Sequence, residues 1–402
     1  MHPFDLIPPA LEQGLCPLER LISPVSLPDD APYARVRALL MMAVERYSVR
    51  LSNLLLPMIS NQDARRDLSL IQRIDMRQEA SFSSLKAREE DEPDQGILLS
   101  MLALELSAVL AQRLPEGEMR QALHFALPEF LDEIYRLSNL MMLTKNKSAQ
   151  KLTGGFVEIM PGRPLMACQR HPYDEVRRPC APESILEDMM PPLLAAVCAL
   201  QQECFLQSAH RAEEPLSQGL YLELSMIAGQ HQVHFESLSA PKAPLERLLL
   251  CQYTEGYLYD SCAQEEDHAA LRQMYLEERD HELSHIRKAA DLLAKEKGEN
   301  IPLPEFPDRL RLGPNKGYVR DVLQNVGITA LREGYTAVGQ LPQGADFFRY
   351  QQRLCPQEEC LPSHQVISQL IEKTGEDYRF EIALHPIEAL RNRQKDNTQV
   401  GR

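Results

Sequence analysis

Several features that would point to common functions are missing from the sequence. No run of eighteen apolar residues occurs, so we expect no segment to span a lipid bilayer. The N-terminus has no basic start followed by an apolar core, which argues against a secretory signal peptide. Basic residues are outnumbered by acids, and the net charge of −15 argues against nucleic acid or an anionic membrane as the main partner.

The nine cysteines also lack any repeated short spacing of the CxxC type. An odd number of cysteines without such a pattern predicts reduced thiols and a cytoplasmic protein. Cys355 and Cys360 are close enough in sequence to pair or to share a metal, although two unrelated thiols are the favoured interpretation. Residues 313–317 (GPNKG) do not have the spacing of a phosphate-binding loop, so they predict no nucleotide site.

Most of the 402 residues instead show the periodicity of amphipathic helices. The composition, 44% hydrophobic and 25% charged, is that of a globular protein long enough for two or three domains. The strongest helical segments form two groups of four, separated by a segment rich in glycine and proline. They are 32–56, 62–86, 96–113 and 117–143 in the first group, and 192–210, 216–239, 243–264 and 268–297 in the second.

Short polar connections within each group are typical of four-helix bundles. We therefore predict an all-α protein with two such bundles in tandem and a proline-rich, partly helical C-terminal extension. The predicted parts are a proline-rich N-terminal arm (1–31), the first bundle (32–144), a linker or loop (145–182), the second bundle (183–298) and the C-terminal extension (299–402).

Acidic residues recur at a nearly constant separation between the two groups, which indicates an ancient duplication. The paired positions are Glu45 with Glu203, Glu79 with His231, Glu105 with Glu255, and Asp132 with Glu282. The first group has almost no histidine at these positions, so its four acids are expected to be protonated or paired with arginine.

Ionisable residues of the second group lie on the apolar stripes of their helices. Glu282 and His285 are three residues apart, so they point the same way and continue the stripe that includes Ile286. Such groups are costly inside a bundle unless they are paired or bind a metal. Glu278 and His281 offer a competing pair one turn earlier, which we assign to the surroundings of the site or to the surface. The candidate metal ligands, which are also the candidate catalytic residues, are Glu203, His231, His234, Glu255, Glu282 and His285.

This set resembles the ligands of ferritin-like di-metal carboxylate proteins, in which two helices each supply a glutamate and two supply Glu-x-x-His. The segment RDHELSHIRKAADLL is similar to the fourth-helix motif of that superfamily. Position 231 is histidine where the superfamily would have glutamate, so Gln230 or Glu236 could contribute instead, and the site holds two metals in an altered geometry or only one. Phe82 and Tyr135 replace histidines in the first group, which resembles a bundle that has lost its metals.

The resemblance implies two iron ions, or iron with manganese, because carboxylates and imidazoles suit these metals. It further implies an oxidase or oxygenase that uses dioxygen to oxidise a small organic substrate. An electron-donor protein and a second copy of the chain are the candidate partners. Peroxide or metal detoxification is an alternative, and so is a non-enzymatic helical scaffold with a relic or structural metal site.

Overall fold

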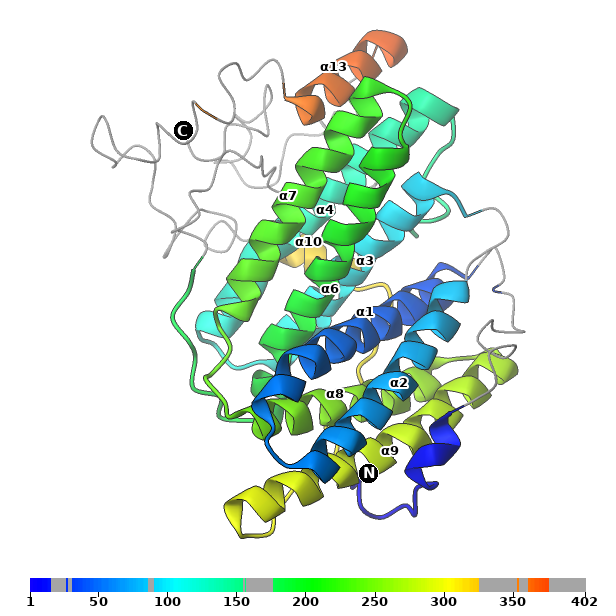
Figure 1. The fold of residues 1–402 in the computed structure, drawn as a ribbon. Coiled ribbons are helices and arrows are strands. Elements are labelled where there is room, and N and C mark those ends of the chain that lie inside the picture. The colour runs from blue at the N-terminus through cyan, green and yellow to red at the C-terminus, as the bar shows by residue number, and fades with distance from the viewer. Residues whose placement is uncertain are drawn as a thin grey trace. The chain divides into compact units, whose positions relative to one another are not determined.

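The computed structural model confirms that the protein is all-α. The residues that it describes are 1–15, 27, 31–85, 90–154, 156, 176–324, 353 and 361–375. Among these residues there are ten α-helices and no β-strand (Figure 1). Cys355 and Cys360 lie outside the described residues, as do most of the predicted linker and the last part of the predicted C-terminal extension.

The eight long helices are α1 (Pro32–Leu55), α2 (Gln62–Ser84), α3 (Glu92–Arg113), α4 (Glu118–Lys145), α6 (Ile185–Arg211), α7 (Pro215–Glu236), α8 (Pro244–Glu265) and α9 (Ala269–Lys297). Two shorter helices, α10 (Lys316–Gln324) and α13 (Pro362–Thr374), and the 3-10 turns η1 (Leu11–Gly14) and η3 (Leu56–Met58) complete the set. These bounds agree with the predicted segments to within a few residues except at the start of α6. That helix begins at Ile185, before the predicted start at 192, and it contains Pro191 and Pro192.

Local sequence signals explain where several helices begin and end. The Asn61 side chain caps α2 by accepting hydrogen bonds from the backbone N–H groups of Asp63 and Ala64. Asp91 and Asp94 form a reciprocal capping box at the start of α3. Gly298 ends α9 with φ of 73°, a left-handed conformation that glycine adopts without steric cost.

The helices are grouped into two compact units, and each unit contains segments that are distant in sequence. Unit 1 comprises Met1–Glu89, Pro179–Ala196 and Ser239–Leu312, and unit 2 comprises Glu90–Arg178, Val197–Leu238 and Gly313–Arg402. Unit 1 therefore contains α1, α2, α8 and α9, whereas unit 2 contains α3, α4, α7, α10, α13 and most of α6.

In unit 1 two helical hairpins form a four-helix bundle. Helix α1 packs against α2, α8 packs against α9, and the hairpins meet through contacts of α1 with α8 and of α2 with α9. The predicted tandem bundles, 32–144 and 183–298, do not coincide with this grouping. The reason is physical: periodicity shows which stripe of a hairpin is buried, but not which other hairpin covers it.

In unit 2, α3 packs against α4, and α13 packs against both α4 and α7. Helix α6 contacts α7, since the Ser225 hydroxyl donates a hydrogen bond to the Gln202 carbonyl at 3.0 Å. Buried Arg136 on α4 forms an ion pair with Asp132 at 2.5 Å and donates to the Ser363 hydroxyl at 2.7 Å. This arginine ties the start of α13 to α4.

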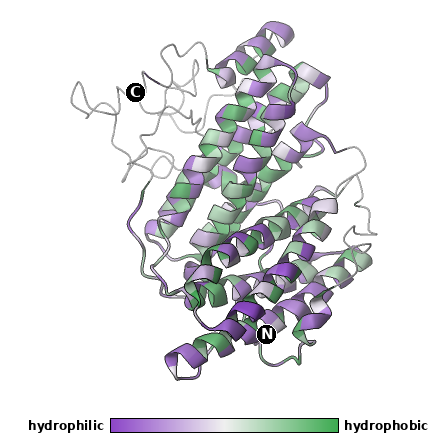
Figure 2. Cartoon of the chain, in the orientation of Figure 1, coloured by the Kyte–Doolittle hydropathy of each residue, from purple (hydrophilic) through white to green (hydrophobic). Residues whose placement is uncertain are grey.

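Two helices, α3 and α6, are long and apolar enough to cross a membrane by length and composition. Of their most apolar windows, 94% and 72% of the residues are buried inside the structure, as in core helices of a bundle. Figure 2 shows that hydrophilic residues are interspersed with hydrophobic ones along the helices, as amphipathic packing requires.

The close approach of α8 and α9 depends on a glycine next to the candidate site. A Cβ atom at Gly256 would lie 2.9 Å from Cδ1 of Ile286 and 3.3 Å from Cζ of Phe306. We expect Gly256→Val to lower the free energy of unfolding by about 1–3 kcal/mol, because overpacking strains the core. The matched control is Gly317→Val, since a Cβ atom there meets nothing within 4 Å. Urea denaturation measures both variants, and equal effects would contradict the packing account.

Candidate metal centre

The core of unit 1 contains ionisable side chains from all four helices of the bundle. Glu45 comes from α1, Asp75 from α2, Glu255 from α8, and Glu282 and His285 from α9. Each of these side chains is fully buried. Four carboxyl groups and one imidazole in an apolar core are unfavourable unless they are protonated, paired or bound to a cation.

Helical phase explains why these residues face the core. Leu68, Ile71, Asp75 and Phe82 are separated by three, four and seven residues, so all four lie on one buried face of α2. On α9, Glu282 and His285 continue a buried face that includes Tyr275 and Ile286. The side chains therefore converge because each acid occupies a position that its helix would otherwise fill with an apolar residue.

Three of these carboxyl groups accept hydrogen bonds from neighbouring side chains. Tyr259 donates to Oε1 of Glu45 at 2.5 Å, and Ser48 donates to Oδ2 of Asp75 at 2.7 Å. Gln252 donates to Oε2 of Glu255 at 2.6 Å. These contacts orient the carboxyl groups and leave other ligand atoms facing the cluster.

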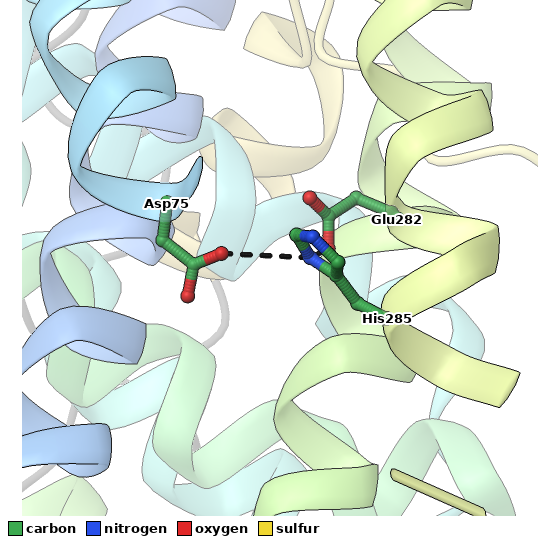
Figure 3. A group of neighbouring side chains, drawn as sticks. All are labelled: Asp75, Glu282 and His285. Atoms are coloured by element: carbon green, nitrogen blue, oxygen red, sulfur yellow. Dashed lines mark hydrogen bonds and ion pairs between the residues drawn. The ribbon is translucent and has the colours of Figure 1, made fainter. Parts of the chain in front are cut away.

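The imidazole of His285 links α9 to α2 (Figure 3). Its Nδ1 lies 3.1 Å from Oε2 of Glu282 and 3.5 Å from Oδ1 of Asp75. The other oxygen of Glu282 accepts a hydrogen bond from Nε2 of Gln78 at 2.7 Å. Glu282 therefore has one oxygen toward the imidazole and one toward the amide of Gln78.

Several buried polar atoms of this cluster have no hydrogen-bond partner. They are Oε2 of Glu45, Oδ1 of Asp75, Oε1 of Gln78 and Nε2 of His285. Unsatisfied buried acceptors are rare in native cores because each one costs desolvation energy. A cluster with several of them could hold a cation.

Ligand atoms in the cluster lie close enough to hold metal ions. Asp75, Glu282 and His285 form one group, and Glu45, Asp75 and Glu255 form another, with the ligand atoms of each group within 4.8 Å of one another. Among the described residues these are the only groups of at least three His, Cys, Asp or Glu side chains with this property. Their oxygen and nitrogen donors, without thiolate, fit iron or manganese.

Burial and crowding shift the protonation of the cluster. Burial, reinforced by neighbouring carboxylates, raises the pKa values of Glu45 and Glu255 well above their usual range. Burial is also the main cause that raises the pKa of Asp75 to about 7, although His285 partly opposes it. For His285, burial lowers the pKa but Glu282 outweighs it, so the net shift is upward. Without a cation the cluster therefore retains protons that a metal ion would displace.

The structure brings together only three of the six ligands predicted from the sequence. Glu255, Glu282 and His285 lie in the cluster of unit 1, whereas the other three lie on helices of unit 2. The residues in unit 2 are Glu203, His231 and His234. The proposed alternatives at position 231, Gln230 and Glu236, are on the same helix of unit 2 and do not join the cluster either.

The three predicted ligands in unit 2 make other contacts. His231 has its Nε2 3.2 Å from Oε2 of Glu129, and its ring packs against Phe130 with centroids 4.6 Å apart. The His234 ring accepts a hydrogen bond from Arg177 at 3.5 Å. Half-buried Glu203 accepts one from Gln207 at 3.4 Å.

Two members of the metal-capable groups, Glu45 and Asp75, were not among the ligands predicted from the sequence. Glu45 was expected to be a relic acid, and Glu79 was considered in place of Asp75. Glu79 instead forms an ion pair with Arg46 at 2.6 Å, as anticipated for the acids of the first group. The position of Asp75 on the apolar stripe of α2 was the signal that could have identified it.

The pair one turn earlier on α9 lies beside the cluster and outside both metal-capable groups. Both carboxylate oxygens of Glu278 accept hydrogen bonds from Arg77. Burial lowers the pKa of His281, which favours its neutral form.

No protein-family model, curated protein or solved structure matches this chain.

Proposed function

We propose that unit 1 contains a di-metal carboxylate centre of the ferritin-like kind, which holds two iron ions or iron with manganese. The observation that carries the proposal is the convergence of fully buried ligands from all four helices, with unsatisfied atoms among them. An acid from each of four helices, with a histidine three residues after one of them, resembles the ligand arrangement of that superfamily. The ligands differ from the predicted set because two hairpins that are distant in sequence supply them.

The centre departs from the superfamily pattern on α2. Asp75-x-x-Gln78 stands where a second acid-x-x-His pair would be expected. The amide oxygen of Gln78 is buried and has no hydrogen-bond partner, so it is available as a weak ligand. This substitution leaves His285 as the single imidazole in the two metal-capable groups of the described residues.

The activity that this centre supports best is the oxidation of a small organic substrate with dioxygen. Iron at the centre would supply electrons for dioxygen reduction, and an electron-donor protein would restore them. The surrounding residues keep the site dry and hold the carboxylates in place through Tyr259, Ser48 and Gln252. Exclusion of water strengthens the electrostatic interactions inside the site and limits side reactions.

A second candidate function is a structural metal site in a non-enzymatic helical scaffold. The observation that favours it is the complete burial of every ligand, because a catalytic centre must admit its substrate. The two functions differ in a measurable way. A catalytic centre consumes oxygen after reduction, whereas a structural centre retains its metal without reacting.

We expect Glu282→Ala and His285→Ala each to remove the metal ion bound by Asp75, Glu282 and His285, because both side chains belong to this ligand group. His281→Ala and Glu278→Ala should retain it, because these residues lie outside both ligand groups. Elemental analysis of protein from iron-supplied cells measures the metal content of each variant. Loss of metal in the second pair of variants alone would place the centre one turn earlier on α9.

The wild-type protein provides the test of function. We expect elemental analysis to find iron or manganese, and the reduced protein to change its absorbance when oxygen is added. Bound metal without oxygen consumption would favour the structural role. Metal-free protein with unchanged stability after incubation with iron and with manganese would refute the metal centre itself.

A further inference from the structure

We infer that the two metal positions are inequivalent: a nitrogen-containing position at Asp75, Glu282 and His285, and an all-oxygen position at Glu45, Asp75 and Glu255 that takes a hard divalent ion. This inference rests on the metal centre proposed above and adds which ion occupies each position. The two groups share one residue, Asp75, and differ in donor chemistry.

The nitrogen-containing position is the better defined of the two. The Nδ1 atom of His285 is already directed at both other ligands, at 3.1 Å from Glu282 and 3.5 Å from Asp75. Imidazole binds the later first-row ions, such as Co²⁺ and Zn²⁺, more strongly than Mn²⁺. The first equivalent of such an ion should therefore bind at this position.

The all-oxygen position has a different preference. Glu45, Asp75 and Glu255 supply carboxylates only, and Oε2 of Glu45 and Oδ1 of Asp75 are buried without a hydrogen-bond partner. Carboxylate oxygen is the donor that Mg²⁺ and Mn²⁺ prefer. The amide oxygen of Gln78 is buried without a hydrogen-bond partner, and its amide nitrogen contacts Glu282 of the nitrogen-containing position at 2.7 Å.

His285 makes the two positions unequal, and Gln78 is its counterpart on α2. Gln78 lies three residues after Asp75 on α2, as His285 lies three residues after Glu282 on α9. Because position 78 carries an amide, the two ligand groups contain one imidazole between them. The shared carboxylate of Asp75 joins the two positions, so each should depend on it.

The test uses the metal-free full-length chain with Co²⁺ and Mn²⁺ as probes. One equivalent of Co²⁺ is added first and one equivalent of Mn²⁺ second. The visible absorption of Co²⁺ reports its ligands, and the electron paramagnetic resonance of Mn²⁺ separates free from bound ion. We expect the Co²⁺ spectrum to saturate at one equivalent and then one Mn²⁺ to bind without displacing it.

Two variants assign the positions. Glu255→Gln should keep the Co²⁺ spectrum and lose Mn²⁺ binding. His285→Ala should weaken binding of the first Co²⁺ by at least about tenfold while Mn²⁺ still binds. His281→Ala is the matched control for the histidine and should behave as wild type. Circular dichroism and the unfolding midpoint of each metal-free variant show whether the fold is retained.

A third variant tests the role of Gln78 directly. Gln78→His adds a second imidazole to the cluster and should raise the affinity for a second equivalent of Co²⁺. If Glu255→Gln and His285→Ala lose both ions equally, or if wild-type protein binds two Co²⁺ ions with equal affinity, the positions are equivalent and this inference fails. If wild-type protein binds neither ion, the proposed metal centre fails.

Discussion

Replacement of Asp75 by asparagine is expected to remove both metal ions, because this side chain is the one that the two ligand groups share. The variant keeps the size of the side chain but lacks the negative charge that a bridging ligand needs. We expect the affinity of each position to fall by more than about 100-fold, since changes outside the ligand shell alone cost 10- to 100-fold. Elemental analysis after gel filtration, in parallel with a Co²⁺ titration, measures the loss.

The metal-free form of the same variant should be more stable than metal-free wild type. Burial and Glu282 disfavour the charged form of Asp75, so its ionised carboxylate destabilises the core at neutral pH. Greater stability together with lost metal would show that the acid is retained for binding rather than for folding. Loss of metal through unfolding would instead lower the stability, and the denaturation midpoint distinguishes the two.

Glu79→Gln is the matched control for Asp75→Asn, since it neutralises an acid one helical turn later on α2. Glu79 forms a partly exposed ion pair with Arg46 and lies outside both ligand groups. The control should therefore retain both ions and change the unfolding free energy by no more than about 1 kcal/mol. Equal metal loss in the two variants would contradict the assignment of Asp75.

Much of the local structure and three of the five residues of the candidate site could be predicted from the sequence. Periodicity, together with prolines at helix starts and Gly298 at the end of α9, identified all eight long helices. The residues Glu255, Glu282 and His285 were found because they interrupt apolar stripes. A buried stripe that contains an acid is informative, since a stripe position is normally reserved for an apolar side chain.

The partnership of the helices could not be predicted in the same way. The hairpins α1–α2 and α8–α9 are separated by more than half of unit 2, and amphipathicity does not specify which hairpins pack together. A four-helix site was therefore sought among four consecutive helices. That assumption excluded Glu45 and Asp75, whose helix faces already met the criterion applied to Glu282.

Histidine chemistry was the second source of error. His231 and His234 have the spacing of a ligand pair and lie on the buried face of α7, as a metal site would require. In unit 2 the contacts of His231 with Glu129 and Phe130 explain its burial without a metal. On α2 the missing histidine was placed at Phe82, whereas the residue three positions after Asp75 is Gln78.

The metal-free protein is expected to lose stability as the pH rises, and bound metal should abolish most of this loss. Glu45, Asp75 and Glu255 have native pKa values above their unfolded values, so the native state holds protons that the unfolded chain has released. Stability is therefore greatest below the unfolded pKa and falls as pH approaches the native pKa, about 7 for Asp75. Each such proton contributes a slope of about 1.4 kcal/mol per pH unit.

The window from pH 6.5 to 8 separates this effect from that of the histidines with lowered pKa, while His285, whose pKa is raised, adds a slope of the same sign. Burial lowers the pKa of His124 to about 4 and also lowers that of His281, so these residues act in the opposite direction only below about pH 6.5. Glu133 in unit 2, whose burial raises its pKa to about 8, adds a slope of the same sign that metal should not remove. The unfolding free energy from urea denaturation should therefore fall more steeply with pH in chelator than in excess Mn²⁺. Asp75→Asn should reduce this slope in chelator. Glu133→Gln should reduce it in both conditions. A metal-free stability that is constant or rises between pH 6.5 and 8 would show that the unit 1 acids are not held protonated, and the coupling of metal binding to proton release would fail with them.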